Sequence, residues 1–282
     1  LVCEGCGDCS VQSNCISVQP LETEFGRKRR IDQSNCNKDF SCVKGFCPSF
    51  VTVHGGEVRR AQTKSASTQA STELLENIPE PELPTTATAY GMLVTGIGGT
   101  GVVTIGALLG MAAHLEGKAV TVMDDTGMAQ KNGAVASHIR IADQAVQLHS
   151  SRMPTGSADL VLGCDLVEST STGTLARCTA GRTQAVVNSK LVPTAAFVLD
   201  WNVNLDARRM VKRIEEATNG RAHFIDASDW ATALSGNSIA ANPFLMGYAW
   251  QKGLIPLSRE SIHQAIELNA VAVDTNLEAF EW

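Results

Sequence analysis

The chain has 282 residues, of which 44% are hydrophobic, 18% charged and 5% aromatic. Its net charge of −6 argues against a general nucleic-acid binder, which would carry a basic surplus. No apolar run reaches the roughly 18 residues that a membrane span needs, so the composition indicates a soluble protein with room for two domains.

Cysteine is concentrated at the start of the chain, with seven of the nine cysteines in the first 47 residues. Cys3, Cys6 and Cys9 follow one another at three-residue intervals on a glycine-containing segment. The seventh, Cys47, directly precedes Pro48. A triple with this spacing and a distant Cys-Pro are typical of the four-iron clusters of bacterial ferredoxins. Because such clusters carry single electrons, the segment predicts a redox function.

The ligand assignment leaves alternatives open. By analogy with two-cluster ferredoxins, the first triple and the Cys-Pro cysteine form one complete set. Cys15, Cys36 and Cys42 then remain, one short of a second four-iron site, and they would hold a three-iron cluster or include structural cysteines. Alternatively, the first four cysteines hold the cluster and the later three pack beside it. We predict one four-iron cluster and leave a second open.

Other uses of these cysteines fit the pattern less well. Disulfides suit a small secreted domain, but no signal peptide is present, and Cys164 and Cys178 lie far along the chain. A structural zinc site usually has two separated C-x2-C pairs, which differ from the spacing here. A zinc-stabilised domain that only mediates assembly is the non-enzymatic alternative. Reduced thiolates and the lack of a leader predict a cytoplasmic protein.

We expect residues 1–53 to form the cysteine-rich iron–sulfur segment. Its basic run, residues 27–30, is expected to be a solvated loop or a docking patch for an acidic electron carrier. Residues 54–88 are rich in Gln, Ser, Thr, Ala, Glu and Pro and predict a linker. The chain starts with Leu1 and reaches its first cysteine two residues later, so we expect it to be an excerpt of a longer polypeptide.

Residues 89–282 alternate between short apolar stretches and helical patterns. The strands are expected at 92–95, 119–123, 134–141, 159–162, 185–187 and 223–225, and helices at 102–116, 205–217, 239–252 and 260–268. Short buried strands interleaved with helices predict a doubly wound, Rossmann-like α/β domain with a largely parallel sheet.

A glycine-rich turn, with glycines at Gly96, Gly98, Gly99 and Gly101, lies between the first expected strand and its helix. Such a turn can bring a phosphate close to the backbone and to the positive end of the helix dipole. Asp124 follows the second strand, about where a dinucleotide-binding domain places its ribose-binding acid. NAD or FAD, another phosphate-bearing ligand such as coenzyme A, and no ligand at all remain possible from the pattern alone.

The stretch 127–140 contains several polar residues, of which Lys131, Asn132 and Ser137 are candidate substrate contacts. Ligands in open α/β sheets bind to loops at strand ends, which favours this interpretation. Alternatively, Ser137 and His138 simply alternate on a half-exposed strand. Asn188 also ends a strand, where a turn or helix N-cap explains it equally well.

Three segments, residues 93–106, 127–133 and 241–247, resemble the gamma domain of 2-oxoacid:ferredoxin oxidoreductases. The cysteine segments at 3–9 and 39–48 resemble those of the large fused indolepyruvate ferredoxin oxidoreductases. The order of cysteine segment, linker and gamma domain is also similar to that family.

The resemblance implies a 2-oxoacid substrate, with indolepyruvate favoured. Thiamine diphosphate and Mg would be bound by domains upstream in the same polypeptide, coenzyme A would take the acyl group, and ferredoxin would accept the electrons. It implies that the glycine turn contributes to the coenzyme A side of the site or packs against the thiamine domains, in place of binding NAD. We expect a homo-oligomer at full length and no activity from this chain alone. An NAD(P)- or FAD-linked oxidoreductase with a ferredoxin-like module is the enzymatic alternative.

Overall fold

The computed structural model describes residues 2–13, 15, 17–33, 36, 38–51, 54–56, 78–127, 133–192, 200, 203 and 205–282. Most of the predicted linker, residues 57–77, lies outside these ranges, so the predicted division at residues 53 and 88 stays a prediction. Within the described residues, no helix has the length and apolar character to cross a membrane.

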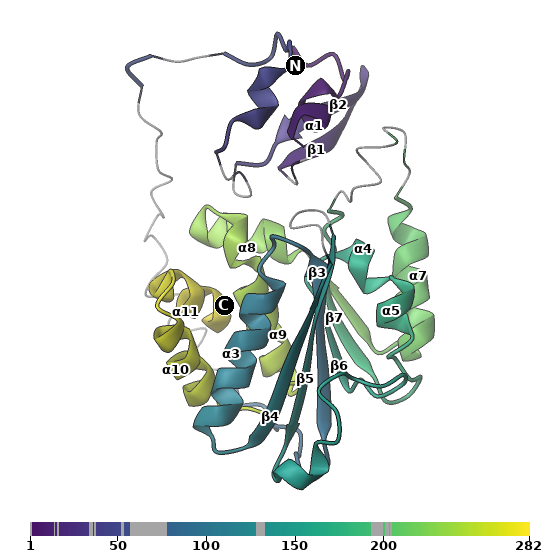
Figure 1. The fold of residues 1–282 in the computed structure, drawn as a ribbon, viewed down its shortest axis with the longest axis vertical. Helices are drawn as coiled ribbons and strands as arrows, with labels where there is room; N and C mark the ends of the chain where they lie inside the picture. The colour runs from purple at the N-terminus through teal and green to yellow at the C-terminus, as the bar shows by residue number, and fades with distance from the viewer. Residues whose placement is uncertain are drawn as a thin grey trace.

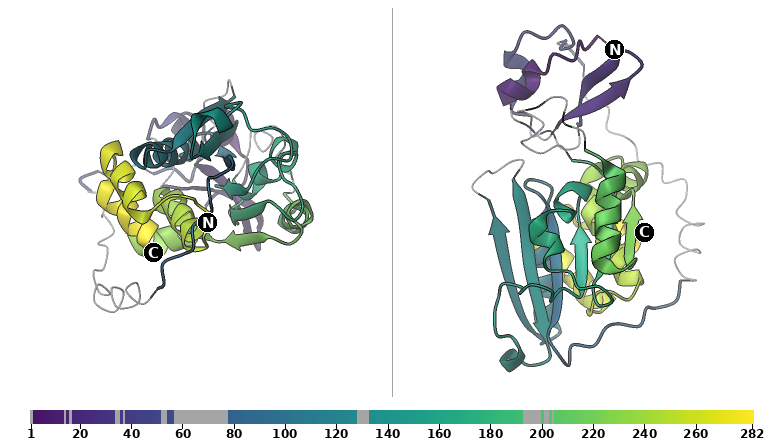
Figure 2. Two further views of the ribbon diagram at one scale, coloured as in Figure 1. Left: turned by 90° about the horizontal axis from the view of Figure 1, so that it is seen from below. Right: turned by 90° about the vertical axis from the view of Figure 1, so that its right-hand side faces the viewer.

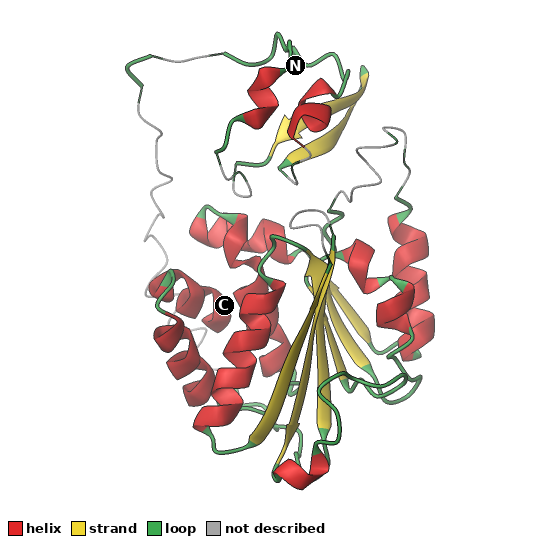
Figure 3. Cartoon of the chain, viewed as in Figure 1, coloured by secondary structure: helices red, strands yellow, loops and turns green. Residues whose placement is uncertain are grey.

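The cysteine-rich segment contains a helix and an antiparallel hairpin (Figure 3). Its elements are α1 (Asp8–Ser13), β1 (Val18–Thr23), β2 (Gly26–Ile31) and the 3-10 helix η1 (Ser41–Lys44). The basic run lies within β2, so the expectation of a loop there was wrong. Its backbone pairs with β1 along the whole strand, and the alternation of side chains in a strand sends neighbouring basic residues to opposite faces.

Among the residues that the structure describes, the main sheet has six strands in the order β4-β5-β3-β6-β7-β8. Their bounds are β3 (Tyr90–Ile97), β4 (Ala119–Thr126), β5 (Ala134–Ala142), β6 (Leu160–Gly163), β7 (Gln184–Asn188) and β8 (Ala222–Ile225). β3, β6, β7 and β8 are parallel to one another, whereas β5 runs antiparallel to both of its neighbours, β3 and β4. The predicted largely parallel sheet is confirmed, with one strand reversed.

Helices cover both faces of the sheet, as a doubly wound domain requires (Figures 1 and 2). One face carries α3 (Val102–Leu115), α8 (Ala227–Ser235), α9 (Ala241–Gln251), α10 (Arg259–Asn269) and α11 (Val273–Glu281). The other face carries α4 (Leu166–Ser169), α5 (Thr172–Leu175) and α7 (Ala207–Thr218). Two short 3-10 helices, η2 (Ala145–Gln147) and η3 (Ser238–Ala240), complete the described elements.

The two faces bury separate hydrophobic clusters because successive side chains of β3 alternate. Met92 and Val94 pack towards α3 and α9, whereas Leu93 packs towards α4 and α7. The expected helix at 239–252 is divided into η3 and α9, since the Asn237 side chain accepts the Ile239 N–H at 2.9 Å and starts the 3-10 turn. α8 and α11 were not predicted from the sequence.

Candidate functional site

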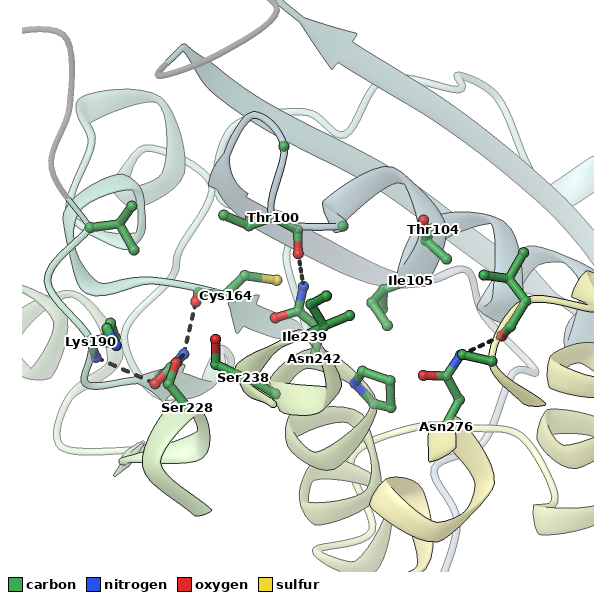
Figure 4. Close-up of a pocket in the computed structure, with 18 of the residues that line it drawn as sticks. Thr100, Thr104, Ile105, Cys164, Lys190, Ser228, Ser238, Ile239, Asn242 and Asn276 are labelled. Carbon is green, nitrogen blue, oxygen red and sulfur yellow. Dashed lines mark hydrogen bonds between the residues drawn. The ribbon is translucent and has the colours of Figure 1, made fainter. Parts of the chain in front are cut away.

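A cavity of about 370 Å³ opens where the glycine turn meets the carboxyl ends of β6 and β7 (Figure 4). Ligands of open α/β sheets bind at this edge, where the chain leaves the strands for helices on opposite faces. Polar groups on its lining include Thr100, Thr104, Asn188, Lys190, Ser228 and Asn242.

The glycine turn forms one wall of this cavity. Gly99 and Gly101 line it, and both have left-handed backbones with φ of 92° and 93° that side chains rarely adopt. Gly101 is the N-cap residue of α3 and has no side chain to satisfy the first N–H groups of the helix. Those donors, together with the helix dipole, make this end of α3 suited to an anion.

The other two predicted glycines serve the packing of the turn. A Cβ at Gly96 would lie 2.9 Å from side-chain atoms of both Cys164 and Val102, so no larger residue fits there without a shift. The Gly98 N–H donates to the Gly133 carbonyl at 2.8 Å, which ties the turn to the start of β5. Neither residue lines the cavity.

Asp165 stabilises the glycine turn through a hydrogen bond to its backbone. This residue was not predicted from the sequence. Its carboxylate is completely buried and accepts the Ile97 N–H and the Glu168 N–H, each at 2.8 Å. Burial raises the pKa of Asp165 to about 7 despite these two donors. An acid two residues after the apolar strand of residues 160–163 was the available sequence signal.

Asn188 joins three elements at the cavity. Its side-chain N–H groups donate to the Cys164 carbonyl at 3.1 Å and the Ser228 hydroxyl at 2.9 Å, and its oxygen accepts the Lys190 N–H at 3.3 Å. The last of these bonds holds the backbone of Lys190, which is one of the residues that line the cavity (Figure 4). Burial raises the pKa of Cys164, so its sulfur remains a thiol.

A second cavity, of about 260 Å³, lies in the cysteine-rich segment and is lined by the four cysteines predicted as one ligand set. These are Cys3, Cys6, Cys9 and Cys47. Backbone N–H groups of Gly5 and Arg29 both donate to the Cys3 sulfur at 3.4 Å. Hydrogen bonds of this kind stabilise thiolates that ligate a metal cluster. Burial, opposed by hydrogen bonds from Ser10 and reinforced by nearby cysteines, raises the pKa of Cys9.

The lining contains the four thiols that one four-iron cluster requires. Across the described residues, no group of three or more His, Cys, Asp or Glu side chains is placed to bind a metal ion. The four thiols surround a cavity, which is the arrangement that a body of several irons and sulfides needs. The lining does not include the other three cysteines of the segment, Cys15, Cys36 and Cys42. Burial, together with the nearby Cys36 and Cys15, raises the pKa of Cys42. Their role as ligands stays a prediction.

The structure treats the candidate residues of the stretch 127–140 differently. Lys131 and Asn132 lie outside the described residues. Ser137 is fully buried, and a Cβ at Gly106 of α3 would collide with its hydroxyl oxygen. Ser137 thus packs β5 against α3 and lines neither cavity described above, which gives its predicted substrate contact no geometric support. His138 points to the opposite face of the sheet and is also buried, so the strand is not half-exposed.

Asp124 does not lie where the ribose-binding acid lies in a dinucleotide-binding domain. In a dinucleotide-binding unit the strand with the ribose-binding acid pairs directly with the first strand. Here the antiparallel β5 lies between β3 and β4, and Asp124 is exposed on the edge strand. The strand order therefore argues against the NAD interpretation of the glycine turn.

Residues 91–282 match the family described as pyruvate ferredoxin/flavodoxin oxidoreductase. The chain is 30% identical over 196 residues to indolepyruvate oxidoreductase subunit IorB of Pyrococcus horikoshii, covering 68% of this chain and 93% of that protein. The IorB subunit of Thermococcus kodakarensis is 29% identical over 196 residues, with the same coverage.

A solved structure shares the fold. The 2-oxoglutarate:ferredoxin oxidoreductase of Magnetococcus marinus, solved with 2-oxoglutarate, coenzyme A and succinyl-CoA bound, aligns with a TM-score of 0.51 at 16% identity. The alignment covers 69% of this chain and 30% of that one. The match over residues 91–282, which contain all of the main sheet except Tyr90, shows that the chain belongs to the pyruvate ferredoxin/flavodoxin oxidoreductase family.

Proposed function

We propose that this chain is the electron-relay segment and gamma domain of a 2-oxoacid:ferredoxin oxidoreductase that acts on indolepyruvate. The reaction is the oxidative decarboxylation of the 2-oxoacid to an acyl-CoA, with the electrons passed to ferredoxin. Curated relatives that align over nearly their whole length are named indolepyruvate oxidoreductase subunits, which supports this substrate.

The four cysteines that line one cavity carry this proposal. Cys3, Cys6, Cys9 and Cys47 would hold a four-iron cluster, and such a cluster supplies a one-electron relay when bound. The chain's own contribution is to orient the thiolates. The two N–H donors to Cys3 fix the first ligand, and the exposed Phe46 and Pro48 lie at the edge of the same cavity.

The glycine-turn cavity would accept the phosphates of coenzyme A. Free N–H groups at the start of α3 and the ammonium of Lys190 are complementary to an anion. The Magnetococcus relative was solved with coenzyme A bound, which makes this ligand a reasonable choice. Lys131 and Asn132, which lie outside the described residues, remain predicted substrate-side contacts.

Other parts of the reaction require partners. Thiamine diphosphate and Mg would be held by thiamine-binding domains of the same polypeptide, and ferredoxin would collect the electrons. In the cell we place the full-length protein in the cytoplasm as a homo-oligomer. None of the described residues of this chain is assigned a catalytic role.

The first test is the content of iron, zinc and acid-labile sulfide per chain after anaerobic purification. We expect about four irons with matching sulfide, as one four-iron cluster requires. About seven or eight irons would extend the site to Cys15, Cys36 and Cys42. Zinc without sulfide would remove the electron relay and support the zinc-stabilised assembly domain instead.

A further inference from the structure

A third cavity, of about 300 Å³, lies on the face of the sheet that carries α4 and α5. The ends of β3, β4 and β5 form its floor, and α4, α5 and the loop before β6 form its walls. It shares no lining residue with the glycine-turn cavity or the cysteine cavity. Nothing in the proposed reaction uses it.

A buried histidine that lines this cavity has an unsatisfied ring nitrogen. His138 is only 1% exposed, and its Nδ1 accepts the Met153 N–H at 3.4 Å. The proton of the neutral ring must then sit on Nε2, which is buried and has no hydrogen-bond partner in the described part of the chain. Burial, reinforced by Arg177 and Arg152, lowers the pKa of His138 to about 4, so the ring is a neutral donor at physiological pH.

A buried arginine nitrogen accompanies the histidine. Arg177 bonds the Gly173 carbonyl through Nη1, but its Nε is buried without a partner among the described residues. At the same cavity, Arg152 is paired with Asp125, with 2.6 Å between nitrogen and oxygen. Glu168 also lines the cavity, and burial raises the pKa of its carboxyl group.

We infer that this cavity binds a small oxyanion, held by the Nε2–H of His138 and the Nε–H of Arg177. Leaving two donors buried and unpaired carries a penalty that native proteins rarely accept, and an acceptor with several lone pairs removes it for both. Arg152 keeps its ion pair with Asp125 at the same cavity, so the preference for an anion comes from the two unpaired donors themselves. A carboxylate and a phosphate both offer acceptors to these donors, whereas a cation offers none.

The first measurement is calorimetric titration of the purified chain with inorganic phosphate, with pyruvate and, as a reference, with sodium chloride at equal ionic strength. Binding of phosphate alone assigns a phosphate-bearing ligand, and binding of pyruvate alone assigns a carboxylate. Either result supports the site when R177Q weakens the binding, because the glycine-turn cavity is itself proposed to accept phosphate. If neither anion binds more tightly than chloride, the donors are satisfied by water and the inference is wrong.

Variants then locate the binding. R177Q is expected to weaken anion binding at least tenfold, and E168Q is expected to tighten it because a neighbouring negative charge is removed. The matched control is R140Q, which changes an arginine on the same strand as His138 that does not line the cavity. Equal affinities for wild type, R177Q and R140Q would place the anion elsewhere and overturn the inference.

Folding defects in a variant do not block the test. The ¹⁵N resonance of the His138 Nε2 in the wild-type chain reports on the same contact without any substitution. We expect it to shift on addition of the binding anion in proportion to the occupancy found by calorimetry. An unchanged His138 resonance at saturation would contradict the assignment even if binding is observed.

Discussion

At the scale of single residues, Arg29 connects the basic hairpin to the cysteine cavity. Its backbone N–H donates to the Cys3 sulfur at 3.4 Å, and its side chain lines the cavity with the four cysteines. Burial lowers the pKa of Arg29, and the adjacent cysteines oppose that effect. The guanidinium stays protonated, so it places a fixed positive charge beside the predicted cluster.

Arg29 should therefore set the reduction potential of the cluster. R29Q is expected to lower the potential by about 60 mV, a tenfold change for a one-electron couple, because a nearby positive charge favours the reduced form. Spectroscopic redox titration measures the potential. K28Q removes the same charge from the opposite face of β2 and is expected to leave it nearly unchanged, so equal shifts in both variants would argue against a local effect.

Lys190 is predicted to bind coenzyme A through its ammonium group. K190Q should weaken coenzyme A binding by about tenfold, since a charged hydrogen bond contributes roughly 1.5 kcal/mol. K212Q, on the exposed face of α7, is the matched control for charge. Unchanged coenzyme A affinity in K190Q would show that coenzyme A does not bind in this cavity.

The buried His138 predicts a pH dependence of stability. Its pKa is about 4 in the folded chain and 6.5 in the unfolded one, so the unfolded chain binds more protons between these values. The contribution of the neutral His138 ring to the free energy of unfolding is complete above the pKa of His138 in the unfolded chain. It is lost as the pH falls through the pKa of His138 in the folded chain. The unfolding free energy of wild type relative to H138Q should rise by about 1–3 kcal/mol from pH 4 to pH 6.5 in urea titrations. A constant difference would show that His138 does not titrate as described.

At the scale of elements, helix contacts depend on small residues at the crossing points. A Cβ at Gly247 of α9 would collide with the backbone carbonyl oxygen of Phe280 in α11. Backbone cannot move aside as a side chain can, so α9 and α11 touch only because residue 247 is glycine. The missed helix α11 thus completes the core around Trp250 and Phe280.

G247A is expected to reduce the unfolding free energy by about 3 kcal/mol through this overlap. G173A is the control, because a Cβ there meets nothing closer than 3.7 Å in a helical turn. That control should be neutral or stabilise by up to about 1 kcal/mol. Thermal or urea unfolding measures both, and equal stabilities of the two variants would refute the role of the α9–α11 contact.

At the scale of the whole molecule, the chain combines the α/β domain of its family with the proposed electron-relay segment, and no catalytic group is assigned to its described residues. Supplied with indolepyruvate, coenzyme A, thiamine diphosphate and oxidised ferredoxin, it should give no ferredoxin reduction above background. A spectrophotometric assay of ferredoxin tests this. Turnover by this chain without an added subunit would show that the catalytic machinery lies within it.

Much of the fold followed from local pattern. The strands at 92–95 and 185–187 lie within β3 and β7, and α3 starts at the expected residue 102. The basic run was misread because charge suggested exposure, whereas cross-strand hydrogen bonds with β1 made it a strand. The reversal of β5 was not predictable, because the direction of a strand depends on the path of the loop that leads into it. A short apolar pattern is the same for either direction.

The sequence by itself determined the cysteine spacing, the glycine turn and the alternation of strands and helices, because each depends on residues close together in the chain. Only the tertiary structure decided which distant groups meet. It put Cys47 with the first triple, Asp165 beneath the glycine turn, and Arg177 beside His138. Contacts of this kind depend on the packing of elements far apart in the sequence, so spacing along the chain does not encode them directly.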